Sequence, residues 1–297
     1  MRALVTGGAG FIGSHLVDSL IEGGHEVVCI DNECAQSNEK FYWNPSCIKS
    51  RANIQSLVDI EPLFEGVDVV FHLAAESRIQ PTIENPTKAA MTNMVGTCNV
   101  LQASRKHGVK RVVYSSTSSA YGLANSPPNR EEQPNDCLNP YSVTKVAGEE
   151  LCKMFNNLFN LNTVILRYFN VYGERQPVRG QYAPVVGIFQ RQVAASETMT
   201  IVGDGLQKRD FTHVSDVVAA NMLAATCDNN EVFGETFNIG SGQNINMLEL
   251  ADMISKDAPR EHIPARQGEA RETLADISKA KGLLGWEPRI KIEEWLK

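Results

Sequence analysis

Short apolar runs alternate with segments of helical spacing along the first part of the chain. Runs typical of buried strands lie at residues 3–5, 25–30, 52–54, 67–73, 110–114 and 162–166. Between several of them, apolar residues recur every three or four positions, which predicts helices over residues 14–21, 83–107 and 140–159. Residues 34–50 have no clear periodicity and predict a loop or a short irregular helix. The alternation predicts an α/β fold, a doubly wound parallel sheet with helices on both faces.

The alternation ends near residue 175, and the rest of the chain is less regular. The pattern there predicts strands over 199–202 and 236–239, and helices to about residue 196, over 215–227, over 246–256 and after Asp276. We therefore expect a main domain over residues 1–175 and a smaller α/β lobe over 176–297. Some strands of the second part are expected to return to the main sheet.

The first apolar run leads into a glycine-rich loop, Gly7-Gly8-Ala9-Gly10-Phe11-Ile12-Gly13, and then into a helix. Glycines at such a position let the backbone turn tightly and approach a pyrophosphate, which lies at the positive end of the helix. The next strand ends in Asp31, whose carboxylate can bind an adenosine ribose 2′-hydroxyl and would repel a 2′-phosphate. Residues 1–175 thus predict a Rossmann-like domain that binds NAD rather than NADP. A glycine-rich turn without a cofactor is the alternative.

A tyrosine and a lysine lie four residues apart at the start of the predicted helix 140–159. Asn139 can cap this helix and Pro140 suits its first turn, so Tyr141 is held near a rigid helix start. Residues four apart share one helix face, so the phenol of Tyr141 and the ammonium of Lys145 can act together in proton transfer. An ordinary exposed Tyr and Lys on an amphipathic helix are the alternative.

Hydroxyl-bearing residues follow the predicted strand 110–114, in the run Ser115-Ser116-Thr117-Ser118-Ser119. At the carboxyl end of a parallel strand, such side chains point into the crevice where doubly wound sheets bind ligands. A serine-rich turn is the alternative. His72 lies inside a buried-type strand and is interpreted as a core histidine with satisfied hydrogen bonds rather than a catalytic one.

Composition narrows the class of protein. The chain has 297 residues, 42% hydrophobic and 21% charged, which is ordinary for a globular protein. A net charge of −7 and a pI near 5.5 give no basic footprint for nucleic acid or an anionic membrane. Seven scattered cysteines without a C-x-x-C pair indicate reduced thiols. With no apolar run of about 18 residues and no signal-peptide pattern, we expect a cytoplasmic protein. We expect no metal site.

Several motifs follow one another in an order that resembles a known family. They are residues 6–13, 72–75, 116–117, the Tyr141-x-x-x-Lys145 pair, and residues 167–170, 209–216 and 275–280. In this order they resemble the extended short-chain dehydrogenase/reductases, and among these the NAD-dependent nucleotide-sugar epimerases and dehydratases. The chain is most similar to UDP-glucose and UDP-N-acetylglucosamine 4-epimerases, from the first strand to about Pro288. As a set, the motifs are more specific for the superfamily than for the reaction.

The resemblance implies an NAD-dependent 4-epimerase of a UDP-hexose, acting on UDP-GlcNAc/UDP-GalNAc, on UDP-Glc/UDP-Gal, or on both. Tyr141 would be the acid/base, Lys145 would hold the nicotinamide ribose and lower the pKa of the phenol, and Thr117 would bind the sugar 4-hydroxyl. Transient oxidation at C4 would give a 4-keto sugar that is then reduced on its other face. The physical chemistry agrees, because nearby positive charge favours the phenolate.

The family pattern also implies two sets of binding residues. Those expected at NAD are Gly7, Gly10, Phe11, Ile12, Gly13, Asp31, Asn32, Asn53, Ile54, Leu73, Ala74, Ala75, Asn93, Ser115, Tyr141, Lys145 and Tyr168. Those expected at the substrate are Ser118, Ser119, Asn170, Arg209, Arg266 and Thr273, with the base and ribose near residues 182–189. Arg266 is preferred to Arg271 for a phosphate, because Arg266-x-Gly268-Glu269 resembles the family's Arg-x-Gly-Asp. Thr273 is small enough to leave room for an N-acetyl group.

Two alternative functions stay open beside this expectation. Ser118 and Ser119 stand where the family's dehydratases carry an Asp-Glu pair, so dehydration is disfavoured. A Thr-Ser-Ser run could instead bind a carboxylate, which leaves a UDP-glucuronate 4-epimerase or decarboxylase as the alternative. A non-catalytic NAD-binding regulator is disfavoured by the intact set of Thr117, Tyr141 and Lys145.

Other parts of the resemblance concern the ends and the surface of the fold. Asn53 replaces the aspartate usual near adenine, and an amide can still bind adenine. Relatives commonly continue beyond Lys297, so we expect a terminal helix to be missing. Helices 84–106 and 140–159 resemble the family's dimer contact and imply a homodimer.

Overall fold

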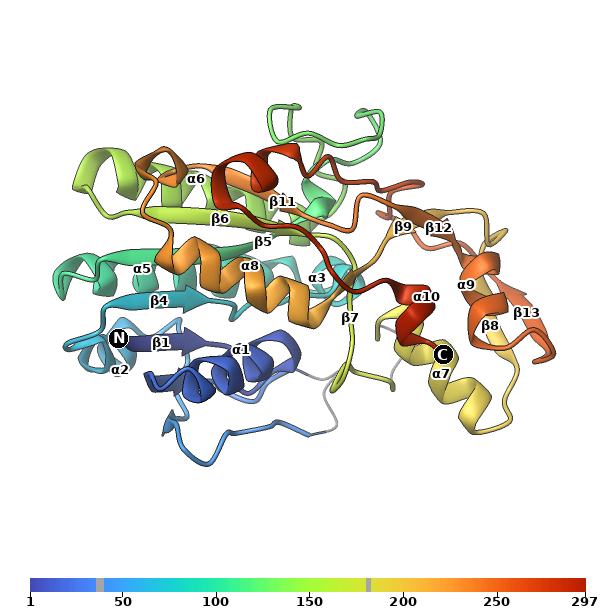
Figure 1. Cartoon of the computed structure of the whole chain (residues 1–297), viewed down its shortest axis with the longest axis horizontal. Helices are drawn as coiled ribbons and strands as arrows, with labels where there is room; N and C mark the ends of the chain where they lie inside the picture. Colours follow the sequence, from blue (N-terminus) through green and yellow to red (C-terminus); the bar gives the residue numbers. More distant parts are fainter. Residues whose placement is uncertain (36–39, 180–182) are drawn as a thin grey trace.

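Seven parallel strands form one sheet in the order β11-β6-β5-β4-β1-β2-β3 (Figure 1). The computed structural model describes residues 1–35, 40–179 and 183–297. From β1 the strand order runs outward in both directions, so the predicted doubly wound sheet is confirmed, with a crevice at the carboxyl ends of β1 and β4. The strands are β1 (Arg2–Thr6), β2 (Glu26–Ile30), β3 (Ile48–Ser50), β4 (Val69–His72), β5 (Arg111–Thr117), β6 (Thr163–Tyr168) and β11 (Thr236–Ile239).

Helices cover both faces of this sheet, and each face has its own hydrophobic core. Alternation along β1 sends Ala3 and Val5 into the core under α1 and α8, and Leu4 into the core under α5 and α6. Because both faces are covered, the strands are apolar throughout rather than alternating. The covering helices are α1 (Phe11–Glu22), α5 (Thr97–Lys106), α6 (Pro140–Phe159) and α8 (Val214–Thr226).

A smaller group of elements, at the right of Figure 1, packs around a third hydrophobic cluster that includes Phe189, Ile201 and Leu250. There β8 pairs with β13 in parallel and β9 pairs with β12 antiparallel. In sequence, α8 and β11 interrupt this group, yet β11 lies in the main sheet beside β6. The elements of the lobe are α7 (Val185–Ala194), β8 (Met199–Val202), β9 (Lys208–Asp210), β12 (Asn244–Asn246), α9 (Met247–Ile254), β13 (Arg260–Ile263) and α10 (Ile292–Trp295).

Short elements connect these parts. A two-stranded parallel pair, β7 with β10, lies where the chain passes from the sheet to the lobe. The helix expected after Asp276 is the π-helical segment η5. The connecting elements are α2 (Leu57–Ile60), η1 (Glu61–Phe64), η3 (Ser118–Ala120), β7 (Val171–Tyr172), β10 (Thr212–His213), η4 (Asn230–Val232) and η5 (Ala280–Leu284).

The single helix predicted over residues 83–107 is confirmed only in part, because the chain is helical from Pro86 to Lys106 but breaks at Asn85. This segment consists of α3 (Ile79–Glu84), α4 (Pro86–Ala90), the π-helical η2 (Met91–Gly96) and then α5. The chain breaks at Asn85, with φ −137° and ψ 78°, because the residue before a proline is driven out of the helical region. The Asn85 side chain then caps α4 by accepting a hydrogen bond from the Lys88 N–H at 3.0 Å.

The strand predicted over residues 52–54 is also misplaced. The edge strand is β3, at the end of the segment interpreted as a loop, and it pairs with β2. Ile54 is buried and joins the core under α5, so its apolar character reflects packing rather than a strand ladder. In contrast, β5 is longer than predicted: it runs to Thr117, which pairs with Tyr168 at the end of β6.

Helix α6 follows its prediction to the residue. Asn139 accepts a hydrogen bond from the Ser142 N–H at 2.9 Å, and the Ser142 hydroxyl completes a capping box. Pro140 occupies the first turn, and Asn160 ends the helix in the left-handed region at φ 53°. Although α6 has 20 residues, no helix of the described chain is both long enough and apolar enough to cross a membrane.

Candidate active site

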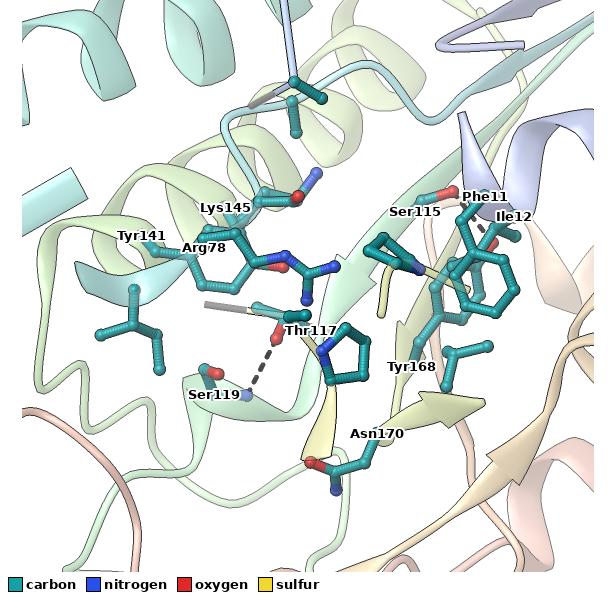
Figure 2. A pocket seen from close by; sticks show the side chains of 18 of the residues that line it. Phe11, Ile12, Arg78, Ser115, Thr117, Ser119, Tyr141, Lys145, Tyr168 and Asn170 are labelled. Carbon is teal, nitrogen blue, oxygen red and sulfur yellow. Dashed lines mark hydrogen bonds between the residues drawn. The ribbon is translucent and has the colours of Figure 1, made fainter. Parts of the chain in front are cut away.

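A cavity of about 500 Å³ opens where the carboxyl ends of β1, β4, β5 and β6 face the lobe. Its wall combines the glycine loop, the end of β5, the first turns of α6 and lobe residues around 200–209 and 266–273. Figure 2 shows labelled side chains from the start of α1, the end of β5 and the first turns of α6 around one space. The cavity lies at the topological switch point of the sheet, where doubly wound folds bind ligands.

Almost all of the residues predicted for the site line this cavity. Asn53 and Asn93 do not. Asn53 accepts a hydrogen bond from the Gln55 N–H at 3.0 Å, and Tyr182 lies outside the described residues. The predicted residues on the wall are Gly7, Gly10, Phe11, Ile12, Gly13, Asp31, Asn32, Ile54, Leu73, Ala74, Ala75, Ser115, Thr117, Ser118, Ser119, Tyr141, Lys145, Tyr168, Asn170, Arg209, Arg266 and Thr273.

Asn93 lies behind the cavity wall, where it links two of the segments that form the wall. The side-chain Nδ2 of Asn93 donates to the backbone carbonyl of Glu76 at 3.1 Å and to the Thr144 hydroxyl at 2.9 Å. Its side-chain Oδ1 accepts from the Glu76 N–H at 2.8 Å. Because Glu76 follows β4 and Thr144 is on α6, this amide ties the loop after β4 to the helix that carries Tyr141.

The glycine loop packs so closely that side chains would not fit. A Cβ on Gly13 would lie 2.1 Å from the Gly7 carbonyl oxygen, and Gly7 itself has φ +70°. Helix α1 begins directly after Gly10, which has no side chain to cap it, so the first N–H groups of the helix remain available to an anion. The loop is therefore shaped for a pyrophosphate at the helix N-terminus.

Asp31 stands at the end of β2 with its carboxylate on the cavity wall. One oxygen accepts from the Ala9 N–H at 3.1 Å and the other from the Glu33 N–H at 2.8 Å. Burial raises the pKa of this carboxyl, and the two backbone hydrogen bonds oppose that shift. Each oxygen keeps a second acceptor site, which suits the hydroxyls of a ribose.

Tyr141, Thr117 and Lys145 come together from α6 and β5 (Figure 2). Burial raises the pKa of the Tyr141 phenol, while a hydrogen bond with Thr117 and the positive charge of Arg78 lower it. Thr117 also accepts a hydrogen bond from the Ser119 N–H at 3.1 Å, which fixes its hydroxyl. The phenol is thus held beside one hydroxyl and one cation.

Lys145 is almost completely buried, with 3% of its surface exposed. Its ammonium lies 4.1 Å from the centre of the Tyr114 ring, a cation–π contact. Burial lowers its pKa to about 7, because a charge that leaves water is penalised more than the neutral amine. A ligand that brings negative or hydroxyl groups to Lys145 would favour its charged form.

At the lobe end of the cavity, two arginines approach one carboxylate. Arg209 lies 3.6 Å and Arg266 lies 4.0 Å from the oxygens of Glu269. Burial lowers the pKa of the Arg209 guanidinium, and the charge of Glu269 opposes that shift. Arg271 does not line the cavity and forms a bidentate pair with the exposed Asp204 at 2.8 Å. Of the two arginines weighed for a phosphate, only Arg266 is on the wall.

Sequence comparison agrees with this geometry. Residues 3–240 match the sequence model of the NAD dependent epimerase/dehydratase family. The chain belongs to this family. NAD is therefore its cofactor, and the close-packed glycines, the uncapped start of α1 and the Asp31 carboxylate are the groups that fit it.

Members of the epimerase/dehydratase family resemble the chain over nearly its full length. UDP-glucose 4-epimerase from Mycolicibacterium smegmatis is 36% identical, over 99% of this chain and 96% of that protein. UDP-glucose 4-epimerase from Thermotoga maritima, solved with UDP-glucose, is 37% identical with a TM-score of 0.94 over 100% of this chain and 96% of its own. UDP-N-acetylglucosamine 4-epimerase from Methanobrevibacter ruminantium, solved with UDP-N-acetylmuramic acid, is 31% identical with a TM-score of 0.92, covering 99% and 95%.

The family also spans neighbouring chemistries. A UDP-glucuronate 4-epimerase and UDP-glucuronic acid decarboxylases are similar to this chain, at 34–35% identity. Solved structures of further similar enzymes hold NAD. Family membership therefore establishes an NAD-dependent enzyme class without selecting the sugar.

Two features of this family member escaped the sequence analysis. The first is a buried ion pair between Glu149 of α6 and Arg167 of β6, to which the Ser116 hydroxyl donates a further hydrogen bond. Glu149 lies one helical turn beyond Lys145 on the same face of α6, and this spacing could have predicted that Glu149 also points inward. The second is Arg78, which points into the cavity beside Tyr141 (Figure 2). Its position after β4 was visible, but its direction depends on tertiary structure.

The expectation for His72 is confirmed. Its ring is 1% exposed, with Nδ1 2.7 Å from the Thr6 hydroxyl and Nε2 2.9 Å from the Thr97 hydroxyl. Thr97 donates its own proton to the backbone carbonyl of Asn93, so its oxygen accepts from Nε2–H of His72. Burial lowers the pKa of His72 to about 3, in agreement with a structural role.

Proposed function

We propose that the chain is an NAD-dependent 4-epimerase of a UDP-hexose. The observation that carries this proposal is one cavity with three chemical parts: a pyrophosphate loop, the Thr117–Tyr141–Lys145 group, and the arginines of the lobe. In this arrangement a UDP-sugar lies with its diphosphate at the lobe and its C4 hydroxyl at Tyr141. Residues 1–175 would hold NAD, and residues 176–297 would hold most of the nucleotide.

Tyr141 takes the proton of the sugar 4-hydroxyl and later returns it. Thr117 hydrogen-bonds the same hydroxyl and orients it toward the phenol. Lys145 binds the nicotinamide ribose and, as a cation, favours the phenolate. Bound NAD would supply a hydride acceptor and donor for C4 of the sugar. Inversion follows when the 4-keto sugar turns over in the cavity and is reduced on its opposite face.

The two serines that follow Thr117 disfavour dehydration. Loss of water from the sugar needs a base to remove a proton and an acid to expel the 6-hydroxyl as water. Here Ser118 and Ser119 follow Thr117, and a hydroxyl cannot readily replace a carboxylate in either role. The reaction therefore ends with the sugar restored at its original oxidation level, and NAD is needed only in bound form.

The lobe supplies the selectivity for nucleotide and sugar. Arg209 and Arg266 bind the diphosphate, with guanidinium forks matched to phosphate oxygens. Thr273 accepts hydrogen bonds from Asn170 at 3.2 Å and from the Asp210 N–H at 3.3 Å, which fixes a small side chain on the wall. This leaves room for an N-acetyl group, so UDP-GlcNAc and UDP-GalNAc are expected substrates, with or without UDP-Glc and UDP-Gal.

A second candidate function, a UDP-glucuronate 4-epimerase or decarboxylase, is supported by one specific observation. Arg78 places a positive charge beside Tyr141, where the C6 end of the sugar would lie. Similar proteins include a UDP-glucuronate 4-epimerase and UDP-glucuronic acid decarboxylases. Both candidates use the same proton transfer at C4.

One experiment tests the proposed reaction. Purified protein is incubated with a panel of UDP-, GDP- and dTDP-sugars, without added NADH, and the products are identified by NMR. We expect inversion at C4 of at least one UDP-hexose. Tyr141→Phe, which removes only the phenol oxygen, should lower kcat by about 100- to 10,000-fold. No C4 inversion in the whole panel, or full activity in Tyr141→Phe, would contradict the proposal.

We further propose a homodimer in a reducing, cytoplasmic compartment. Met91, Met94 and Val95 of η2 and Val143 of the adjacent α6 are exposed apolar residues on the helices expected at the dimer contact. All seven cysteines are free thiols, which suits such a compartment. Light scattering should give twice the mass of one chain, and Val143→Glu should shift it toward one chain.

A further inference from the structure

A loop of the lobe reaches across to the start of helix α6. This loop, residues 266–270, is called the strap, and four of its five residues line the cavity. Both ends of the strap belong to the lobe. It follows β13, and directly after it the Arg271 carbonyl accepts from the Lys208 N–H of β9 at 3.1 Å. Only the middle of the strap leaves the lobe, to pack on α3 and α6.

Two side-chain amides hold the middle of the strap against the main domain. Asn139 Nδ2 donates to the Gly268 carbonyl at 2.8 Å, and Gln80 Nε2 of α3 donates to the Gln267 carbonyl at 3.0 Å. Gly268 has φ +76°, and a Cβ there would lie 3.3 Å from Asn139 Cβ and 3.5 Å from Ile83 Cδ1. Glycine therefore suits both the backbone conformation and the close approach of the strap.

Asn139 uses both ends of its amide. Its Oδ1 caps α6 by accepting from the Ser142 N–H at 2.9 Å, while its Nδ2 donates to Gly268 in the strap. The partners fix this orientation, because an N–H only donates and a carbonyl only accepts. The side chain is 6% exposed, so both hydrogen bonds are shielded from water. Serine or aspartate would cap α6 equally well, but neither carries an amide donor for the strap.

One side chain thus joins the two parts of the site that would hold opposite ends of the substrate. Tyr141 lies two residues after Asn139, in the first turn of α6, and Arg266 lies two residues before Gly268 in the strap. In the proposed complex Tyr141 receives the C4 hydroxyl and Arg266 binds the diphosphate on C1. The hydrogen bond from Asn139 to the strap therefore fixes the spacing between these two groups.

We propose that Asn139 is a positioning residue that holds the strap over the cavity and thereby places Arg266 on the diphosphate of the nucleotide sugar. This inference rests on the proposed function, because it takes Arg266 to bind that diphosphate. When the strap is released and the cap of α6 is kept, the nucleotide binds more weakly, whereas Tyr141 keeps its place for proton transfer.

Two substitutions separate the strap from the cap. Asn139→Ser keeps an oxygen for the Ser142 N–H, but this oxygen lies one bond nearer the backbone than Nδ2 and falls short of Gly268. Asn139→Asp also keeps the cap, and it sets a carboxylate oxygen against the Gly268 carbonyl. The matched control is Asn85→Ser, because Asn85 also caps a helix directly before a proline, accepting from the Lys88 N–H at 3.0 Å, but on the exposed surface.

Calorimetric titration of the NAD-loaded protein with UDP measures nucleotide binding without a reaction. Loss of one hydrogen bond should raise the Kd for UDP at least about fivefold in Asn139→Ser, and Asn139→Asp should raise it at least as much. Asn85→Ser should leave the Kd unchanged, and urea denaturation checks that each variant is folded. A smaller increase in either Asn139 variant, or no binding of UDP to the wild type, overturns the proposal.

A double-mutant cycle shows whether Asn139 acts through Arg266. In protein that already carries Arg266→Gln, Asn139→Ser should raise the Kd for UDP by less than half of the factor seen in its absence. A larger factor overturns the positioning role.

Steady-state kinetics with an epimerised UDP-sugar give an independent readout. Asn139→Ser should raise KM while kcat stays within about threefold of wild type, because the lost contact serves binding rather than proton transfer. A fall in kcat at unchanged KM overturns the proposal. The expected pattern of UDP affinities without epimerisation of any UDP-hexose would support the role of Asn139 and contradict the proposed reaction alone.

Discussion

Glu149 of α6 and Arg167 of β6 form a bidentate ion pair that is sealed inside the molecule. Arg167 Nε lies 2.8 Å from one carboxylate oxygen and Nη2 lies 2.7 Å from the other, and the two side chains are 0% and 3% exposed. The Ser116 hydroxyl of β5 donates to the same carboxylate. Lys145 lies one turn before Glu149, so this pair fixes the face of α6 that carries Lys145 against the two strands that carry Ser116 and Arg167.

We expect Glu149→Gln to unfold far more easily than the wild type. The substitution leaves the Arg167 guanidinium buried without its counter-ion, which costs about 3–5 kcal/mol. Urea denaturation should show a large decrease in midpoint with little change in slope. The control is Glu150→Gln on the same helix, which breaks an exposed pair with Lys153 of 2.8 Å and should cost less than about 1 kcal/mol. Equal midpoints for Glu149→Gln and Glu150→Gln would refute the structural role.

Gly13→Ala should damage both NAD binding and stability. The new methyl group would lie 2.1 Å from the Gly7 carbonyl oxygen, so α1 must move away from the loop at a cost of about 1–3 kcal/mol. NAD released from denatured protein measures occupancy, and thermal unfolding measures stability. Gly282→Ala is the matched control, because its methyl group meets no atom within 4 Å. A normal NAD content in Gly13→Ala would show that the loop is not the pyrophosphate site.

Asp31→Asn should weaken NAD and reduce the discrimination against NADP. The amide has one acceptor oxygen where the carboxylate has two, so it cannot serve both the Ala9 and Glu33 N–H groups as Asp31 does. Loss of a hydrogen bond to a charged group, worth about 1.5–3 kcal/mol, corresponds to roughly 10- to 100-fold in the Kd for NAD. Titration of the NAD-free protein with NAD and NADP measures both effects. An unchanged ratio of the two affinities would contradict the role of Asp31.

The sequence predicted those parts of the fold whose signals are local. Helix α6 was placed correctly because Asn139, Pro140 and the apolar spacing all agree, whereas the break at Asn85 was missed because the apolar pattern continues through Pro86. The candidate site was predictable where loops and strand ends carry it. Arg78 and Asn53 were not, because the direction of a side chain on a connecting segment is set by tertiary packing rather than by spacing.

Lys145→Met should make the NAD-free protein more stable, and the gain should shrink as the pH rises. The pKa of Lys145 is about 7 in the folded protein and about 10.4 when unfolded. Below pH 7 both states carry the proton, so the folded state bears the full cost of the buried charge. Between pH 7 and 10.4 the unfolded state binds more protons, so wild-type stability rises by up to about 1.4 kcal/mol per pH unit.

Lys145→Met lacks this titration. Its unfolding free energy relative to wild type should therefore fall by about 3 kcal/mol between pH 7 and 9.5. Urea denaturation at both pH values gives the two differences in unfolding free energy. Lys153→Met, on the same helix at a side chain that is 37% exposed, is the matched control. If the difference in unfolding free energy between Lys145→Met and wild type does not depend on pH, then burial does not lower the pKa of Lys145 in the NAD-free protein.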